Sequence, residues 1–196
     1  MNVLIVHAHP VADSFNHALV AAARRGLESV GHTVTTLDLY AMNYRAVMNT
    51  SEWKAYETDS PVLDPIVAEH VELIRSSEAL VFIYPTWWSA MPAIMRGWVE
   101  RTMVMGVAFE LDASRRLRPK LRHIRHLVGI TTHGSPWWYV KLVNDNGRRL
   151  ISRGLRFNTG LRTKVSWHAL YALDRQTPER RNEFLTLVEK KMACIQ

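Results

Sequence analysis

The 196-residue sequence contains a single cysteine, Cys194, so no disulfide can form within the chain. It also lacks any run of about 20 apolar residues, which is the length that a membrane-spanning helix needs. Cys194 stands near the end of the chain, where a catalytic thiol would be held poorly in place. These absences predict a protein of the reducing cytoplasm with no integral membrane segment.

Sequence motifs of several well-known enzyme classes are absent as well. The chain has no glycine-rich dinucleotide fingerprint, no Walker loop and no Gly-x-Ser-x-Gly nucleophile elbow. None of the loops at residues 7–16, 85–91 and 131–139 brings together two acidic residues, as a hydrolase with paired carboxylates requires. His7 and His9 lie two residues apart, but no third or fourth ligand follows at a familiar metal-site spacing. We therefore expect no metal ion.

The charge balance is basic, with 25 Lys and Arg residues against 18 Asp and Glu residues and a formal net charge of +7. Such an excess favours anionic partners without identifying one. Much of it lies in residues 115–126, which we interpret as a solvated face, with contact to an anion as the alternative. No nucleic-acid-binding motif accompanies this segment, so we expect no nucleic-acid partner.

Aliphatic runs that are typical of buried strands alternate with helical patterns along the chain. We predict strands at residues 3–6, 32–39, 79–84, 127–132 and 163–170. We predict helices that begin after Ser14, at Pro61, at Pro92 and at Pro178, and one near residues 140–153. Residues 40–60 are expected to form a long loop with room for a short helix. In the last helix, Phe184, Leu187 and Val188 are expected to face the sheet.

Strands that alternate with helices imply βαβ units and a parallel sheet. We therefore predict one α/β domain over residues 1–196, with three layers and five parallel strands. Five strands in a chain of this length suit the flavodoxin-like order 2-1-3-4-5, which the sequence itself does not fix. In such sheets the ligand lies beyond the carboxyl ends of the strands. The three most unusual loops, residues 7–16, 85–91 and 131–139, all follow strands. We expect them to converge at one edge of the sheet.

The first of these loops ends in Ser14, Phe15 and Asn16 at the start of a predicted helix. The unpaired N–H groups of a helix N-terminus, with a serine hydroxyl and an asparagine amide, suit a phosphate or pyrophosphate. A plain helix cap with Phe15 in the core is the alternative. His9 is interpreted as a donor to a phosphate or cofactor oxygen, and a merely packed histidine is the other interpretation.

The second loop places Trp87 and Trp88 side by side after a buried strand. Two exposed indoles are unfavourable unless something covers them, and a flat conjugated ring would do so. The backbone N–H groups of residues 86–89 could reach the polar edge of the same ring. Alternatively, the indoles pack under neighbouring loops or against a dimer partner.

The third loop combines small and hydroxylic residues with an aromatic cluster. Gly134 permits a backbone turn close to a ligand, and Tyr139 could donate a hydrogen bond to a cofactor carbonyl or to a substrate. The alternative is an aromatic turn that merely closes the end of the sheet. The three loops together offer phosphate binding and aromatic stacking, which indicates a cofactor site.

Three segments, residues 5–16, 84–101 and 131–139, resemble the signatures of the NAD(P)H:quinone oxidoreductases of DT-diaphorase type. They span about the first 140 residues in the order and spacing of that family. The resemblance implies a flavodoxin-like fold, FAD or FMN as cofactor, NAD(P)H as co-substrate, and a homodimer with the flavin sites at its interface.

The resemblance also assigns residues to the parts of the flavin. The phosphate portion would be held by His9, Ser14, Phe15 and Asn16. The isoalloxazine ring would be lined by Pro85, Thr86, Trp87 and Trp88. The other edge of the ring would meet Thr131, Thr132, Gly134 and Tyr139.

Tyr139 matches the active-site tyrosine of the family, and His133 stands where the family has a glycine before Gly134. Asp145 occupies a place where some members have an active-site histidine. We predict Tyr139 and His133 as catalytic residues of an enzyme that passes two electrons from NAD(P)H to a quinone or similar acceptor by a ping-pong mechanism. The alternative function is a flavin-binding electron carrier, or a regulatory subunit of a membrane transport system.

Overall fold

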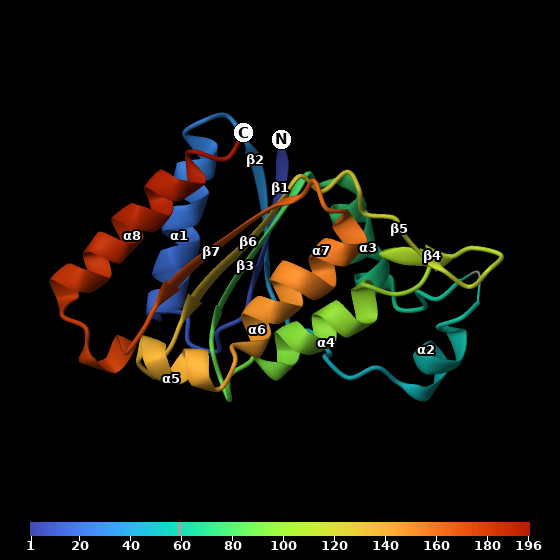
Figure 1. Cartoon of the computed structure of the whole chain (residues 1–196), viewed down its shortest axis with the longest axis horizontal. Helices are drawn as coiled ribbons and strands as arrows, with labels where there is room; N and C mark the ends of the chain where they lie inside the picture. The colour runs from blue at the N-terminus through green and yellow to red at the C-terminus, as the bar shows by residue number, and fades with distance from the viewer. Residues whose placement is uncertain (59) are drawn as a thin grey trace.

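The computed structural model describes residues 1–58 and 60–196, and its centre is a five-stranded sheet (Figure 1). All four strand pairs are parallel, and the order is β2-β1-β3-β6-β7. The strands are β1 (Asn2–His7), β2 (Thr33–Asp38), β3 (Ala79–Pro85), β6 (His126–Thr132) and β7 (Lys164–Leu170). The predicted α/β class and strand order are confirmed, and each predicted strand lies within two residues of its observed bounds.

Helices cover both faces of the sheet because successive side chains of the strands point to opposite faces. Val3 and Ile5 pack against α1 (Phe15–Glu28) and α8 (Pro178–Met192). Leu4 and Val6 pack on the other face. That second face is covered by α3 (Pro65–Ser76), α4 (Ala93–Thr102) and the π-helical segment η1 (Leu150–Leu155). The result is the predicted arrangement of three layers.

Helix caps explain where several helices begin. Ser14 caps α1 by accepting from the His17 backbone N–H, and Thr177 caps α8 in the same way. The helix expected from Pro61 begins at Pro65 instead, since the Asp64 side chain accepts from the Ile66 N–H. The expected long loop holds α2 (Thr50–Ala55).

The helix predicted near residues 140–153 is broken into shorter pieces. They are α5 (Trp137–Leu142), α6 (Asn146–Arg149), η1 and α7 (Arg156–Thr159). The break follows from Asn144, whose φ of +71° ends α5, and from Asp145, whose side chain caps α6. In α8, Phe184 and Val188 are buried as predicted, but Leu187 is 43% exposed, so its predicted contact with the sheet is wrong. Its position on the helix turns it away from the packed stripe.

A small antiparallel hairpin was not predicted. It consists of β4 (Phe109–Leu111) and β5 (Leu117–Pro119), and its turn carries the first part of the basic run of residues 115–126. A short 3₁₀ helix, η2 (Leu173–Arg175), precedes α8. In the described part of the chain, no helix combines the length and the apolar character that crossing a membrane requires.

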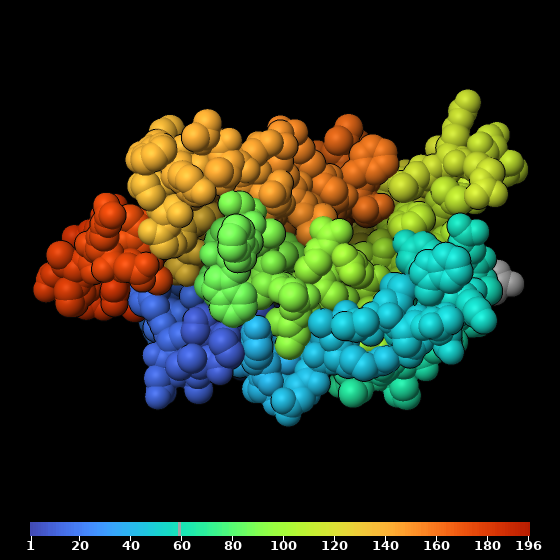
Figure 2. All heavy atoms as spheres, turned by 90° about the horizontal axis from the view of Figure 1, so that it is seen from below, coloured from blue at the N-terminus to red at the C-terminus, as the bar shows by residue number. Residues whose placement is uncertain are grey.

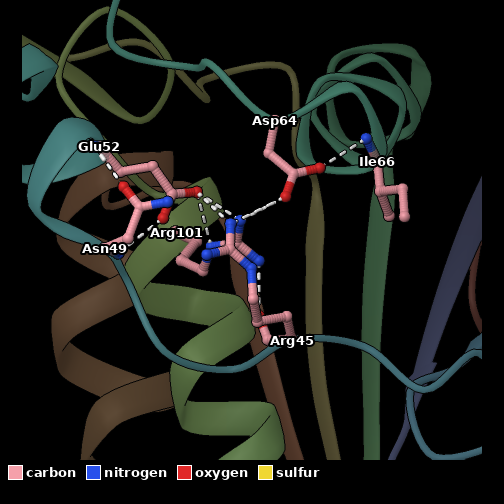
Figure 3. Close-up of polar contacts among 6 residues, drawn as sticks. All are labelled: Arg45, Asn49, Glu52, Asp64, Ile66 and Arg101. Carbon is pink, nitrogen blue, oxygen red and sulfur yellow. Dashed lines mark hydrogen bonds and ion pairs between the residues drawn. The ribbon is translucent and has the colours of Figure 1, made fainter.

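A buried ion network joins α2, α3 and α4 (Figure 3). The Arg101 guanidinium donates to the Glu52 carboxylate and, at 2.7 Å, to Asp64. Arg45 donates to both carboxylates from the exposed side. Glu52 also accepts from the Asn49 N–H at 2.8 Å, which completes the cap of α2. These contacts tie the long segment after β2 to the end of α4.

The close approach of that segment to α4 depends on Gly97. A Cβ atom at this position would lie 2.1 Å from the Ala46 carbonyl oxygen, which is too short for any non-bonded contact. Gly97 therefore lets the chain after β2 pass directly over α4 and bring Arg45 to Arg101.

Candidate functional site

The three loops singled out from the sequence meet at the carboxyl edge of the sheet. Figure 2 views the molecule from this edge, and the blue, green and yellow-orange segments that hold the loops lie beside one another. Hydrogen bonds join them: the Thr86 N–H donates to the Thr132 carbonyl at 2.8 Å, and the Asn16 amide donates to the Thr132 hydroxyl at 3.0 Å. The predicted convergence of the loops is thus observed.

The first loop presents the N-terminus of α1. Ser14 is the N-cap and is half-buried, so its hydroxyl lies at the surface where the unpaired helix N–H groups begin. The His9 Nδ1 lies 3.1 Å from the Val11 backbone nitrogen and 3.2 Å from the Val11 carbonyl oxygen, so these contacts suit either tautomer of the neutral ring. Burial lowers the pKa of His9, so the neutral ring predominates at pH 7. Nε2 of His9 makes no hydrogen bond to the described residues and is therefore available to a ligand.

Two other residues of the first loop have mixed roles. Phe15 packs against the core cluster under α1, in agreement with the core alternative for this residue. Asn16 is 2% exposed and braces the third loop through Thr132. Its Oδ1 has no hydrogen-bond partner among the described residues, so this buried acceptor is left unsatisfied.

The second loop is a tight turn with unusual backbone angles. Trp87 and Ala90 exchange two backbone hydrogen bonds of 3.0 Å, and the two residues between them, Trp88 and Ser89, have φ values of +49° and +59°. Positive φ is unfavourable for a bulky residue such as tryptophan, and strain of this kind gathers at functional sites. Trp88 is fully exposed and Trp87 is 41% exposed. Among the described residues, no loop covers the Trp88 indole, whereas Trp87 is partly covered.

The third loop places His133 at the edge of the interior. Its ring is 2% exposed and stacks on Tyr171, with ring centroids 4.8 Å apart. Burial lowers the pKa of His133, and the Asp145 carboxylate, 4.0 Å from Nε2, opposes that effect. Nε2 has no hydrogen-bond partner in the described part of the chain. A neutral imidazole with a free nitrogen therefore stands near a carboxylate.

A cleft of about 230 Å³ lies between the second and third loops. It is lined by Thr86, Trp88, Ser89, His133, Gly134, Ser135, Tyr139 and Val140. The cleft brings together five of the predicted site residues and adds two serines. Pro85, Thr131 and Thr132 are buried beneath it, where the Thr86 and Thr131 hydroxyls lie 2.8 Å apart. Gly134 is not among the glycines with positive φ. Its predicted role is therefore to let a ligand approach the backbone closely, because it has no side chain.

A second, polar cleft of about 300 Å³ shares Val140 with the first. Its cationic lining consists of Lys141, Arg148, Arg149 and Arg153. The basic run of residues 115–126 lies elsewhere, since the β4–β5 hairpin stands on the opposite side of the molecule from α5 (Figures 1 and 2). The cationic residues next to the candidate site therefore do not belong to the basic run of residues 115–126.

Several residues at this edge were not found from the sequence. His17 lies in the first turn of α1, 2.9 Å from Asp38 at the end of β2 and 3.3 Å from His7 at the end of β1. Tyr171 follows β7 and stacks on His133. The signal was available in the sequence, because His17 falls three residues after the helix cap. His7 and Asp38 end strands at the expected edge, and Tyr171 follows one.

The cluster of His7, His17 and Asp38 also bears on the prediction that no metal binds. Among the described residues these three form a group whose potential ligand atoms lie within 4.8 Å of one another. The sequence spacing could not reveal it, since the group is assembled from two strands and a helix. Its atoms already hydrogen-bond to one another, and the absence of a metal stays a prediction.

Comparisons with known proteins agree with this geometry. The sequence model of a family described as "Flavodoxin-like fold" matches residues 1–155. NAD(P)H dehydrogenase [quinone] 1 of Rattus norvegicus is 31% identical over 151 residues, which cover 69% of this chain and 55% of that protein. Ribosyldihydronicotinamide dehydrogenase [quinone] of Homo sapiens is 32% identical over 170 residues, which cover 76% of this chain and 71% of the human protein.

A solved structure extends the similarity over nearly the whole chain. The NAD(P)H:quinone oxidoreductase of Methanothermobacter marburgensis superimposes with a TM-score of 0.85 at 29% identity. The match covers 98% of this chain and 96% of that one. By contrast, the match spans only about half of the rat relative, so that protein extends well beyond the shared region.

Proposed function

This chain belongs to the flavodoxin-like family of NAD(P)H:quinone oxidoreductases, and from that premise we propose that it transfers two electrons from NAD(P)H to a quinone or similar small-molecule acceptor. Its membership bears out the expected class of enzyme. We propose further that residues 1–196 form one flavin-binding domain of a cytoplasmic homodimer. FAD is the proposed cofactor, and FMN is the alternative.

One observation carries this proposal: a helix N-terminus and an aromatic cleft stand side by side at the carboxyl edge of the sheet. A flavin has an anionic phosphate portion and a flat ring system, so it needs both features at once. The α1 N-terminus offers unpaired N–H groups and the Ser14 hydroxyl, and the His9 ring in the preceding loop has Nε2 available to a ligand. The exposed indoles of Trp87 and Trp88 offer the stacking surface.

When bound, a flavin supplies the redox chemistry, since it accepts a hydride from NAD(P)H and passes two electrons to a quinone. The residues of the chain would bind the flavin and the substrates, orient them and supply the protons. Tyr139, 42% exposed at the start of α5, would donate a hydrogen bond from its hydroxyl to the oxygen that gains negative charge. His133, a neutral ring at pH 7, would hold its proton at Nε2, the nitrogen that faces the Asp145 carboxylate. A single cleft for donor and acceptor accounts for the proposed ping-pong order.

The proposal is tested by the absorption spectrum of the purified protein, recorded again after incubation with excess FAD or FMN and desalting. We expect the two visible bands of an oxidised flavin to remain with the protein. Addition of NADH or NADPH under anaerobic conditions should bleach them, and menadione should restore them. Retention of neither flavin would contradict the proposed function and leave only the fold.

Steady-state kinetics then separate the enzyme from an electron carrier or regulatory subunit. We expect appreciable turnover of NAD(P)H with menadione, and parallel lines when both substrates are varied. Intersecting lines would contradict a shared cleft, and flavin binding with negligible turnover would favour the carrier. Light scattering on the flavin-loaded protein tests the homodimer.

A further inference from the structure

The polar cleft of about 300 Å³ beside the candidate site is bordered mainly by basic side chains, and we call it the cationic cleft. Its four basic residues, Lys141, Arg148, Arg149 and Arg153, are all exposed around its rim. The lining contains one acidic residue, Asp145. Because an arginine guanidinium is not deprotonated in proteins, the cleft keeps a positive charge at any physiological pH.

The charges on the rim are not neutralised within the described part of the chain. Exposed arginines of other helices have acidic partners, as in the pairs Arg24–Glu28 and Arg96–Glu100. Among the described residues, none of the four basic side chains of the cleft forms an ion pair. These side chains are therefore able to bind an anion without giving up an existing partner.

The carboxylate of the cleft is engaged on its inner side. Asp145 caps α6 by accepting from the Arg148 N–H at 3.1 Å, and its other oxygen lies 4.0 Å from His133 Nε2. The Asp145 side chain is 12% exposed, whereas the basic residues of the rim are exposed. An anion that enters the cleft from solvent consequently meets the positive charges first.

The local sequence also departs from what a stable helical segment favours. Residues 140–162 contain six basic residues and one acidic residue. Arg149 and Arg153 lie four residues apart, and like charges at this spacing destabilise a helix. Arg153 stands in the π-helical segment η1, and π-helical turns are frequent at functional sites. Violations of local rules are expected where a segment serves function, so both features favour a binding role.

The cationic cleft adjoins the cleft that we propose for the flavin ring and the substrates. Val140 lines both clefts. His133 lines the proposed flavin cleft and stacks, with ring centroids 4.8 Å apart, on Tyr171, which lines the cationic cleft. A single layer of side chains therefore separates the two.

The backbone holds the cationic cleft in this place. The Asn146 N–H donates to the Ser89 carbonyl at 2.9 Å, which ties the start of α6 to the second loop. A Cβ atom at Gly147 would clash with the Tyr84 hydroxyl, so only glycine lets α6 approach the carboxyl end of β3 so closely. Figure 1 shows α5 and α6 at this edge of the sheet. Arg148 and Arg149 follow directly and are thereby positioned beside the flavin cleft.

We propose that the cationic cleft binds the phosphate groups of NAD(P)H while the nicotinamide ring lies in the neighbouring cleft. This inference rests on the proposed function. In the dinucleotide a single ribose separates the ring from the pyrophosphate, so the phosphates must lie next to the cleft that holds the ring. Planar guanidinium groups bind phosphate oxygens through paired, charge-assisted hydrogen bonds. Arg149 and Arg153 are the residues to which we assign these contacts.

A matched series of electron donors isolates the phosphates. NADPH, NADH and N-ribosyl-dihydronicotinamide present the same reacting ring, and only the last has no phosphate. With menadione as acceptor, Arg149→Gln and Arg153→Gln should each lower kcat/KM for NADH and NADPH about tenfold, as for the loss of a charge-assisted hydrogen bond. The kcat at saturating donor and the kcat/KM for the riboside should not change.

The control variant removes the same charge from another place. Arg162→Gln alters a second basic cleft, which Arg162 lines with Arg122 and Lys164 at the start of β7, the opposite edge of the sheet. This variant should leave kcat/KM unchanged for all three donors. Added salt should lower kcat/KM for NADH in the wild type and leave the value for the riboside unchanged, since salt screens exposed charges.

The pattern over the donors decides the proposal. A loss with both NADH and NADPH supports contact with the pyrophosphate, and a loss with NADPH alone supports contact with the 2′-phosphate. No loss with either dinucleotide would overturn the proposal, and so would an equal loss with the riboside. A loss confined to a sulfonated naphthoquinone acceptor would assign the cleft to the acceptor and overturn it as well.

Phosphate binding can also be read without flavin or turnover. Calorimetric titration of the flavin-free protein with ADP-ribose, which carries the pyrophosphate but no nicotinamide, should show binding that Arg149→Gln weakens about tenfold. Adenosine, which has no phosphate, should show no such difference. Equal binding of ADP-ribose by both proteins, or none by the wild type, would overturn the proposal. If the protein binds no flavin, the proposed function fails, while this titration still decides whether the cationic cleft holds phosphates.

Discussion

Two clusters of titratable side chains in this molecule have different surroundings. Arg101 is sealed between α2, α3 and α4, with its side chain 2% exposed and its carboxylate partners anchored by helix caps (Figure 3). His17 and Asp38 are 27% and 24% exposed, and their cluster opens onto the N-terminus of α1. The first cluster is saturated by its own members, whereas the second stands beside free donors.

The difference teaches that a strongly shifted pKa does not by itself mark a functional site. Burial opposes the ionisation of Asp64, yet hydrogen bonds from Arg101 and Arg45 outweigh it and bring its pKa to about 2. No cleft of the candidate site touches this residue. What distinguishes the His17 cluster is the unsatisfied backbone next to it.

The largest expected effect is on stability, at Arg101. Arg101→Met leaves the buried Glu52 carboxylate without its main partner, so we expect the free energy of unfolding to fall by about 3–5 kcal/mol in urea denaturation. Arg96→Met, on the same helix, is the control: its pair with Glu100 is half exposed and should contribute less than about 1 kcal/mol. Similar losses in both variants would contradict the distinction between a sealed cluster and a surface pair.

Tyr139→Phe should show the opposite pattern, with loss of activity and no loss of stability. We expect kcat with menadione to fall about 100-fold, because the hydroxyl that stabilises developing charge is gone. The unfolding free energy should change by less than about 0.5 kcal/mol, since the side chain is 42% exposed. Tyr56→Phe, in a tyrosine packed on the core away from the cleft, should leave kcat unchanged. An unaltered kcat in Tyr139→Phe would remove this residue from the catalytic assignment.

Acid should lower the free energy of unfolding in two separate pH ranges, one for each cluster. The pKa of His7 is depressed from 6.5 to about 4, so the unfolded chain takes up a proton first and stability falls between these values. The pKa of Asp64 is depressed from 3.8 to about 2, so its stabilisation is present above 3.8 and is lost as the pH falls toward 2. Unfolding curves against pH should lack the first decline in His7→Gln and the second in Asp64→Asn. A single decline shared by both variants would contradict the assignment.

The smallest expected effect concerns the basic run. Arg116→Ala and Arg118→Ala should change the ratio of kcat/KM for NADPH and NADH by less than about twofold, since the β4–β5 hairpin lies far from the cleft and exposed charges are screened beyond about 10 Å. A selective loss with NADPH would show that the hairpin reaches the donor and would revise the position of the site.

The strands and the helix caps were predictable because their signals are local. Continuous apolar runs mark residues 79–84 and 127–132 as strands buried on both faces, and Ser14 caps α1 as its sequence context indicates. The break after α5 was not predictable, since it depends on the left-handed conformation of Asn144. The start of α3 was misplaced because Pro61 and Pro65 carry the same local signal, and only the Asp64 side chain decides between them.

The candidate site also has one part that was predictable from the sequence and one part that was not. Loop positions after strands can be assigned from the order of the strands, so the convergence of Ser14, Thr86 and Thr132 was expected. Contacts between side chains of distant segments were not, and the pairs His133–Tyr171 and His17–Asp38 belong to this class. No periodicity in a single segment reports which partner from another segment will meet it.

The sequence by itself determined the fold class and the edge at which a ligand would lie, because periodicity and strand–helix alternation act over short stretches of chain. The strand order suited the five predicted strands, but only the tertiary structure decided it. Only the tertiary structure decided which charges are sealed and which face a free helix end. Burial and hydrogen-bond saturation depend on elements that are far apart in the chain. For that reason Arg101 and His17, both polar residues on helices that follow strands, have different environments here.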